Sequence, residues 1–139
     1  MADPRVAMLK TVPLFAHCNN KQIEFIATQV EDMDFPAGRV LCTEGQSGGD
    51  FFMLLAGGAD VTRQSKPIAK MVPGDFFGEI AVVDGGPRTA TVTTTVPSRC
   101  LVLGPRQFQN VVHQNVDIAH SIMKALTLRL REAGAAKAD

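Results

Sequence analysis

The chain has 139 residues, of which 45% are hydrophobic and 20% charged, and its formal net charge is zero. Such a chain is long enough for a single globular domain with a buried core, and its charge balance argues against a protein that coats nucleic acid or anionic membrane. Three cysteines at wide separations support neither a disulfide framework nor a zinc site. The sequence contains no signal-like apolar stretch and no run of membrane-spanning length, so we expect a cytoplasmic protein.

The N-terminal part, about residues 1–30, is predicted to be helical with an interruption at Pro13. Asn20 is the expected N-cap of a helix in which Ile23, Ile26 and Ala27 share one face.

Residues 31–103 have the pattern of an antiparallel β structure. Short segments rich in Val, Phe, Leu and Thr are separated by turn signals such as PAG, EGQSGG, VPGD and DGGP. This punctuation predicts about eight short strands in an antiparallel barrel or jelly roll.

Residues 104–134 are predicted to form two helices. Gly104-Pro105 can open the first, because proline at the first helical position gives up only an amide that has no helical partner. The second is expected from about Val116 to a stop at Gly134. Their apolar stripes are predicted to consist of Phe108, Val111 and Val112, and of Ile118, Ile122, Leu126 and Leu130. The expected architecture is a single α+β domain over residues 1–139, mainly β with flanking helices.

The stretch FFGEIAVVDGGPRTATV, which begins at Phe76, carries the chemistry of an anion site. Gly78 lets a ligand approach the main chain, and a helical turn at 79–82 would direct unpaired amides outward. Arg88 can supply a bidentate contact to a phosphate, and Glu79 can accept a hydrogen bond from a sugar hydroxyl. On the residues alone, a surface glutamate, a β-turn and a salt-bridged arginine remain an equal alternative.

The same stretch resembles the phosphate-binding cassette of cyclic-nucleotide-binding domains, whose pattern is F-G-E-[aliphatic]-A, a short loop and R-[small]-A. It matches from Gly78 to Ala90 without a gap. The likeness extends to the helical entry LKTVPLFAHC and to the closing helices in PRQFQNVVHQNVDIAHSIMKALTLRLRE. These closing helices are similar to those of the catabolite activator protein type, and the family also includes protein kinase A regulatory subunits.

The resemblance implies that cyclic AMP or cyclic GMP binds inside the barrel, at a cassette spanning residues 76–90 that includes Phe77 and Gly78. Glu79 would take the ribose 2′-OH, and Arg88 would hold the cyclic phosphate with the amides of Ile80 and Ala81. Thr89 and Ala90 would line the phosphate and the base edge. A hydroxyl at the position of Thr89 can bond the guanine amino group, yet bacterial relatives with a hydroxyl there commonly respond to cyclic AMP, which we favour.

Further candidates concern the base. Val61 and Met71 align with base-pocket positions of the activator family, although both would also suit an ordinary core. Arg129 aligns with a helix arginine near the nucleotide and could stack on the base, or it is one of several solvated charges in RLRE.

Other functions fit the sequence less well. A metal-dependent enzyme on a small barrel needs histidines clustered on strands, whereas His17, His113 and His120 lie in the predicted helical parts. Neither G-x-S-x-G nor H-E-x-x-H occurs, so we expect no catalysis, no metal and no cofactor. An iron–sulfur sensor lacks its cysteine cluster. A transcription factor would need a recognition helix after the last helix, so we expect no direct DNA binding.

We therefore expect a non-catalytic sensor, standalone or part of a longer regulator, channel or enzyme. Ligand binding would re-pack the C-terminal helices about hinges at Gly104-Pro105 and Asn115–Val116. Those helices could contact an effector protein or form a homodimer seam, or the same face could simply pack on the barrel. The residues of this seam at near-heptad spacing are Ala119, Ile122, Leu126 and Ala133.

Overall fold

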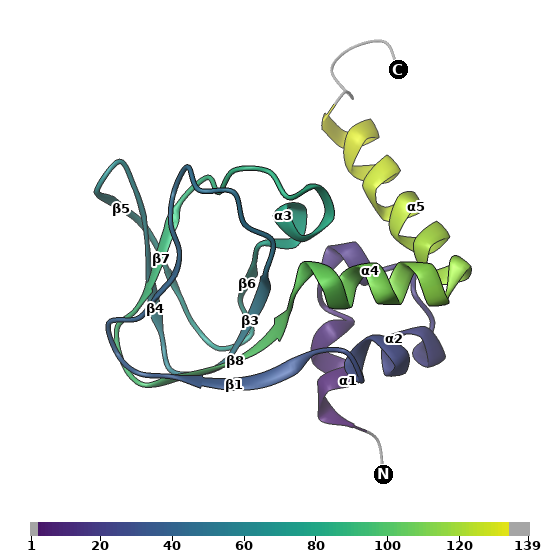
Figure 1. Ribbon diagram of the computed structural model, residues 1–139, viewed down its shortest axis with the longest axis horizontal. Helices are drawn as coiled ribbons and strands as arrows, with labels where there is room; N and C mark the ends of the chain where they lie inside the picture. Colours follow the sequence, from purple (N-terminus) through teal and green to yellow (C-terminus); the bar gives the residue numbers. More distant parts are fainter. Residues whose placement is uncertain (1–2, 134–139) are drawn as a thin grey trace. The chain divides into compact units, whose positions relative to one another are not determined.

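The computed structural model describes residues 3–133, without the side chains of Ile80 and Ala133. The described residues form two compact units: Val30–Phe108, and residues 3–29 together with residues 109–133. The first contains the β-strands and the second is helical (Figure 1). The assignment of the whole chain to one domain stays a prediction. Within residues 3–133, no helix is long and apolar enough to cross a membrane.

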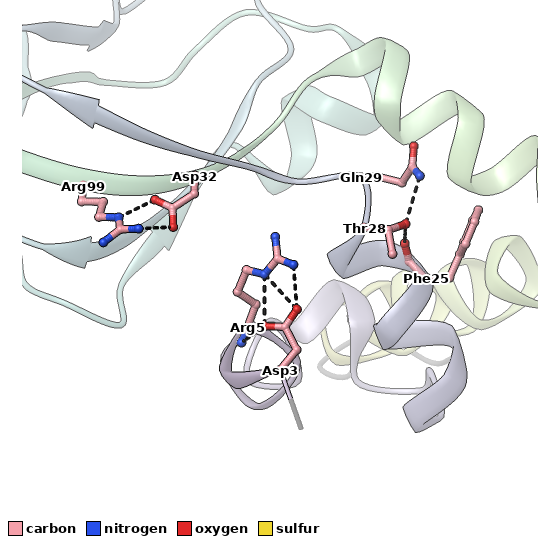
Figure 2. Close-up of polar contacts among 7 residues, drawn as sticks. All are labelled: Asp3, Arg5, Phe25, Thr28, Gln29, Asp32 and Arg99. Carbon is pink, nitrogen blue, oxygen red and sulfur yellow. Dashed lines mark hydrogen bonds and ion pairs between the residues drawn. The ribbon is translucent and has the colours of Figure 1, made fainter. Parts of the chain in front are cut away.

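The N-terminal helices confirm a helical start, but the interruption lies at residues 10–12, and Pro13 begins a 3₁₀ helix instead. They are α1 (Pro4–Leu9), the short 3₁₀ helix η1 (Pro13–Phe15) and α2 (Asn20–Ala27). Asp3 caps α1 by accepting the Arg5 backbone N–H at 2.9 Å (Figure 2). Hydrogen bonds from the Arg5 guanidinium to Asp3 lower the pKa of that carboxyl.

Asn19, rather than Asn20, is the N-cap of α2, so the predicted start was wrong by one residue. The Asn19 side chain accepts the Gln22 backbone N–H at 2.9 Å, and the Gln22 side chain accepts the Asn19 N–H at 2.8 Å. This reciprocal capping box satisfies two amides, which a cap at Asn20 could not do with Gln22. Ile23, Ile26 and Ala27 are all buried, as predicted.

The C-terminal helices begin at the predicted residues, with α4 at Pro105–Gln114 and α5 at Val116–Ala133. The end predicted at Gly134 lies outside the described residues. Ile118 and Ile122 are buried, but Leu130 is 72% exposed, so the predicted stripe was wrong in its last turn. A spacing of four residues rotates by about 40° per step around a helix with 3.6 residues per turn. Ala125, seven residues after Ile118, is buried instead.

The Val30–Phe108 unit holds eight antiparallel strands in two four-stranded sheets (Figure 1). Their orders are β1-β8-β3-β6 and β2-β7-β4-β5. The strands are β1 (Glu31–Phe35), β2 (Val40–Cys42), β3 (Phe51–Ala56), β4 (Ala59–Arg63), β5 (Lys66–Met71), β6 (Phe76–Phe77), β7 (Thr91–Thr94) and β8 (Ser98–Leu103). The eight antiparallel strands confirm the prediction, while closure of the sheets into a barrel stays a prediction.

Apolar side chains of both sheets share one core. Phe52 of β3 stacks on Phe77 of β6 with ring centroids 4.9 Å apart, and Met71 and Val92 of the second sheet are buried in the same cluster. On the outer side, Arg99 of β8 forms a two-bond salt bridge with Asp32 of β1 (Figure 2). Both of those side chains are partly solvated, so the pair contributes little to stability.

The hairpin of β4 and β5 borders the candidate site. Gln64 and Ser65 form its two-residue turn, and both have positive φ, at 52° and 64°. Turns of this kind match the right-handed twist of the flanking strands. The Gln64 N–H donates to Glu44 Oε1 at 2.9 Å, which fixes the tip of the hairpin to the segment after β2.

Candidate functional site

A cavity of about 650 Å³ lies in the Val30–Phe108 unit, among the β4–β5 hairpin, β6, and the segment from α3 (Glu79–Asp84) to β7. Its volume falls in the range of roughly 300–1,000 Å³ that is typical of small-molecule sites. It is lined by Cys42, Val61, Arg63, Ile68, Ala69, Lys70, Met71, Asp75, Phe76, Phe77, Gly78, Glu79, Ala81, Asp84, Gly86, Pro87, Arg88, Thr89, Ala90 and Val92.

Gly78 joins β6 to α3 in a backbone conformation that favours glycine, with φ of +85°. The first i→i−4 bond of α3 runs from the Val82 N–H to the Gly78 carbonyl at 3.0 Å. The amides of Glu79, Ile80 and Ala81 therefore precede the helical ladder, as the amides of a first turn do. The predicted helical turn at 79–82 is confirmed, and it begins at the cavity wall.

Arg88 is held by its backbone against the turn that follows β2. Its N–H donates to the Gln46 carbonyl at 3.0 Å, and its own carbonyl accepts the Gly45 N–H at 2.8 Å. Next to it, Pro87 forms an isolated antiparallel bridge with Ser47. These contacts fix where the arginine leaves the main chain.

The Arg88 guanidinium is held close to Gly78. Its Nη2 donates to the Asp50 carbonyl at 2.7 Å, while Nη1 would lie 2.6 Å from a Cβ built on Gly78. Because the Asp50 carbonyl is neutral, this bond orients the positive charge without cancelling it. A half-buried cation beside the start of a helix is suited to binding an anion.

Glu79 contributes a carboxylate to the same cavity. The residue is half-buried, and its Oε2 atom is shielded from solvent. An ionised carboxylate only accepts hydrogen bonds, so a ligand that meets Glu79 needs a hydroxyl or amino donor at that point.

The structure brings most of the predicted site residues to this cavity. Phe77, Gly78, Glu79, Ala81, Arg88, Thr89, Ala90, Val61 and Met71 all line it. The backbone of Ile80 belongs to α3, and its side chain is not described. Arg129 lies on α5, in the helical unit, and its role as a lid stays a prediction. No cluster of potential metal ligands occurs within residues 3–133.

Several lining residues were missed from the sequence, above all Cys42, Arg63 and Lys70. The alternation of side chains along a strand could have indicated Arg63, because it lies two residues after Val61 on the same face. Cys42 donates weakly to the Ala90 carbonyl across 3.5 Å. Burial raises the pKa of its thiol, and the charge of Arg88 opposes that effect.

Known proteins resemble this chain in both sequence and fold. Residues 32–115 match the model of the cyclic nucleotide-binding domain. The cAMP-dependent protein kinase regulatory subunit of Eremothecium gossypii is 32% identical over 111 residues, which are 79% of this chain and 24% of that protein. The CRP-like cAMP-activated global transcriptional regulator of Mycobacterium tuberculosis is 25% identical over 137 residues, which are 95% of this chain and 61% of that protein.

A solved structure, the N-terminal domain of a transcriptional regulator from Streptomyces coelicolor A3(2), superposes with a TM-score of 0.85. It is 27% identical, and the match covers 95% of this chain and 98% of that one. The chain thus spans less than two thirds of the two curated relatives named above, but nearly all of this solved domain. Since the family model matches more than half of its residues, the chain belongs to the cyclic nucleotide-binding domain family.

Proposed function

We propose that this chain binds a cyclic nucleotide in the 650 Å³ cavity and acts as a non-catalytic sensor. The observation that carries the proposal is the convergence of three features on that cavity: the Arg88 guanidinium, the first amides of α3 and the Glu79 carboxylate. A cation and amides suit a phosphate, and a carboxylate acceptor suits a ribose hydroxyl. No single simple anion would use all three.

In this proposal, Arg88 and the amides of Ile80 and Ala81 hold the cyclic phosphate, while Glu79 accepts the ribose 2′-OH. The backbone at Gly78 allows close approach, with Phe77 beside it. Further along the cavity, the base lies between two groups of residues. Val61 and Met71 form an apolar wall, and Thr89 and Ala90 form the end of the cassette.

Cyclic AMP is proposed as the preferred ligand over cyclic GMP. The names of the relatives from Eremothecium gossypii and Mycobacterium tuberculosis both specify cAMP, which supports this choice by analogy. Thr89 is exposed and lines the cavity, and in this proposal its hydroxyl would meet the base of either nucleotide.

Titration with cyclic AMP, cyclic GMP and 5′-AMP tests the proposal. At a free ligand concentration of a hundredfold its dissociation constant, we expect the free energy of unfolding to rise by about 2.7 kcal/mol. The stability gain is read by thermal denaturation, and the dissociation constant by calorimetry. 5′-AMP serves as the control, because it has the same base and ribose as cyclic AMP but its phosphate is not cyclised. We expect it to bind more weakly than cyclic AMP. If neither cyclic nucleotide stabilises the protein, the proposed function is wrong.

The proposed output is a re-packing of the C-terminal helices on ligand binding. Gly104 precedes α4, and Asn115 separates α4 from α5. The Asn115 side chain accepts the Ile118 N–H at 3.1 Å, which caps α5 as an independent helix. Arg129 on α5 is the candidate lid over the base. A ligand can drive such a change only as far as its affinity differs between the two arrangements.

Hydrogen exchange of the backbone amides tests this output. Cyclic nucleotide should change the exchange rates of amides in α5, residues 116–133, in addition to those of the cassette at 76–90. The β1 amides, which lie about forty residues before the cassette in sequence, serve as an internal reference. Protection confined to the cassette, with α5 unaltered, would contradict the re-packing.

The partner that reads this output is proposed to be an effector protein or a second copy of the chain. Val116, Met123 and Leu130 of α5 are 75%, 56% and 72% exposed, and they recur every seven residues. Such a repeat suits a helical seam. Ile122, a member of the predicted seam, is buried within the protein and is not accessible for this role.

The setting is proposed to be the cytoplasm, where Cys18, Cys42 and Cys100 would stay as the free thiols that the structure has. The chain is proposed to work as a single domain without a cofactor. The alternative is that the chain is the ligand-sensing part of a longer regulator, channel or enzyme. The names of its relatives favour this, since they include a kinase regulatory subunit, a transcriptional regulator and a potassium channel.

A further inference from the structure

Arg63, the last residue of β4, lies at the cavity in contact with the cassette. Its Nε–H donates to the Thr89 carbonyl at 2.9 Å, so the guanidinium is tied to the residue that follows Arg88. The arginine is otherwise exposed to solvent at the cavity mouth.

The backbone that carries Arg63 is fixed from two directions. Arg63 pairs with Lys66 across the two-residue turn of the hairpin. The next residue, Gln64, donates to Glu44 Oε1 at 2.9 Å, and the Glu44 N–H donates to Thr91 Oγ1 at 2.9 Å. The hairpin tip, the segment after β2 and the start of β7 thus form one hydrogen-bonded assembly, which positions the guanidinium before any ligand arrives.

The side of β4 indicates which part of a nucleotide Arg63 would meet. Val61 and Arg63 are two residues apart on one strand, so their side chains project from the same face. Val61 belongs to the apolar wall, whereas the phosphate end is occupied by Arg88, Gly78 and the α3 amides. Arg63 therefore lies beside Val61 and Thr89, at the end of the cavity where the proposed function puts the base.

The chemistry of a guanidinium selects among bases. It presents a fork of N–H donors and no acceptor, and the bond to Thr89 uses only one of these donors. Guanine offers two adjacent acceptors, N7 and O6, on one edge, which match such a fork. Adenine offers N7 beside its N6 amino group, which is itself a donor and opposes the fork.

We propose that Arg63 is a specificity-determining residue that donates hydrogen bonds to the N7/O6 edge of a 6-oxopurine. This inference rests on the proposed cyclic-nucleotide function. Its contribution favours cyclic GMP and cyclic IMP, and so it narrows the preference for cyclic AMP that other parts of the site confer. Arg63 would thereby set how strongly the protein discriminates between cyclic AMP and cyclic GMP.

The test measures dissociation constants of cyclic AMP, cyclic GMP and cyclic IMP for the wild-type chain and for Arg63→Met. Methionine keeps an unbranched side chain of similar length without the donors. The affinities for cyclic GMP and cyclic IMP, each relative to cyclic AMP, should fall by about tenfold. Arg63→Lys, which retains the charge but loses the fork, should also lower both ratios.

Two matched variants separate Arg63 from other effects. Lys66→Met removes a positive charge from the strand that pairs with β4, and it should leave the ratios unchanged. Thr89→Val should lower the affinity for cyclic GMP relative to that for cyclic IMP, because hypoxanthine lacks the 2-amino group that a threonine hydroxyl could bond.

The outcomes separate the role of Arg63 from the proposed function. If Arg63→Met weakens all three nucleotides equally, or none of them, while the wild-type chain binds them, the specificity role of Arg63 is wrong and the proposed function stands. If the wild-type chain binds no cyclic nucleotide, both are wrong.

Discussion

Replacing Arg88 with alanine is expected to weaken cyclic-nucleotide binding by about 2–5 kcal/mol, which corresponds to a loss of roughly thirtyfold to several thousandfold. The guanidinium is half-buried and held by the Asp50 carbonyl at 2.7 Å, so it is already oriented toward the cavity. Removing it would leave a phosphate desolvated beside α3 without its cationic partner. Calorimetric titration of the variant with cyclic AMP and cyclic GMP measures the effect.

The fold should survive this substitution. The two backbone hydrogen bonds of Arg88, with Gln46 and Gly45, do not depend on its side chain. The Asp50 carbonyl loses a donor, which we expect to cost about 1 kcal/mol of stability. Arg88→Lys is the matched variant, because it keeps the charge and loses the bidentate geometry, and it should bind with intermediate affinity. Wild-type affinity in a folded Arg88→Ala protein would show that Arg88 does not hold the ligand.

The features that sequence predicted best are those set by residues close together in the chain. Gly78, Glu79 and the turn at 79–82 follow one another, and a glycine before a short helix fixes their geometry locally. The start of α4 at Pro105 is similarly local. The N-cap of α2 was also within reach, since only Asn19 stands three residues before a glutamine that can complete a capping box.

The features that sequence missed depend on strand pairing. Arg63 meets Thr89 because β4 pairs with β7, and β7 follows the cassette directly. Cys42 reaches the Ala90 carbonyl because β2 pairs with the other edge of β7. These neighbours are far apart along the chain, and their register is determined by the packed sheet rather than by any short motif. Alternation from Val61 indicates the face of Arg63, but not the partner across the sheet.

The exposed end of α5 illustrates a different limit. Leu130 fits an apolar pattern of four-residue steps, yet it is 72% exposed. A pattern in sequence identifies apolar side chains without saying what covers them, and a four-residue step drifts away from the buried face.

Gly78→Ala is expected to damage both the fold and the site. A Cβ at this position would lie 2.4 Å from the Asp50 carbonyl oxygen and 2.6 Å from Arg88 Nη1. The same carbonyl accepts the Arg88 side chain, so the methyl group pushes apart both members of that hydrogen bond. The positive φ adds strain for any residue with a Cβ, and we expect stability to fall by about 1–3 kcal/mol. Because the guanidinium is displaced, the loss of affinity should approach the range of about 2–5 kcal/mol given for Arg88→Ala.

Gly85→Ala provides the matched control, because it separates backbone strain from the steric effect. Gly85 ends α3 with φ of +68°, and a Cβ there would meet nothing within 4 Å. It should therefore lose a similar amount of stability from its backbone while binding cyclic nucleotide almost as well as the wild-type chain. Urea denaturation measures the free energy of unfolding of each variant, and calorimetry measures its affinity for cyclic nucleotide. Equal affinity losses in the two variants would mean that strain in α3, rather than displacement of Arg88, weakens the site. If Gly78→Ala binds cyclic nucleotide with unchanged affinity, the ligand does not depend on the Arg88 guanidinium lying close to residue 78.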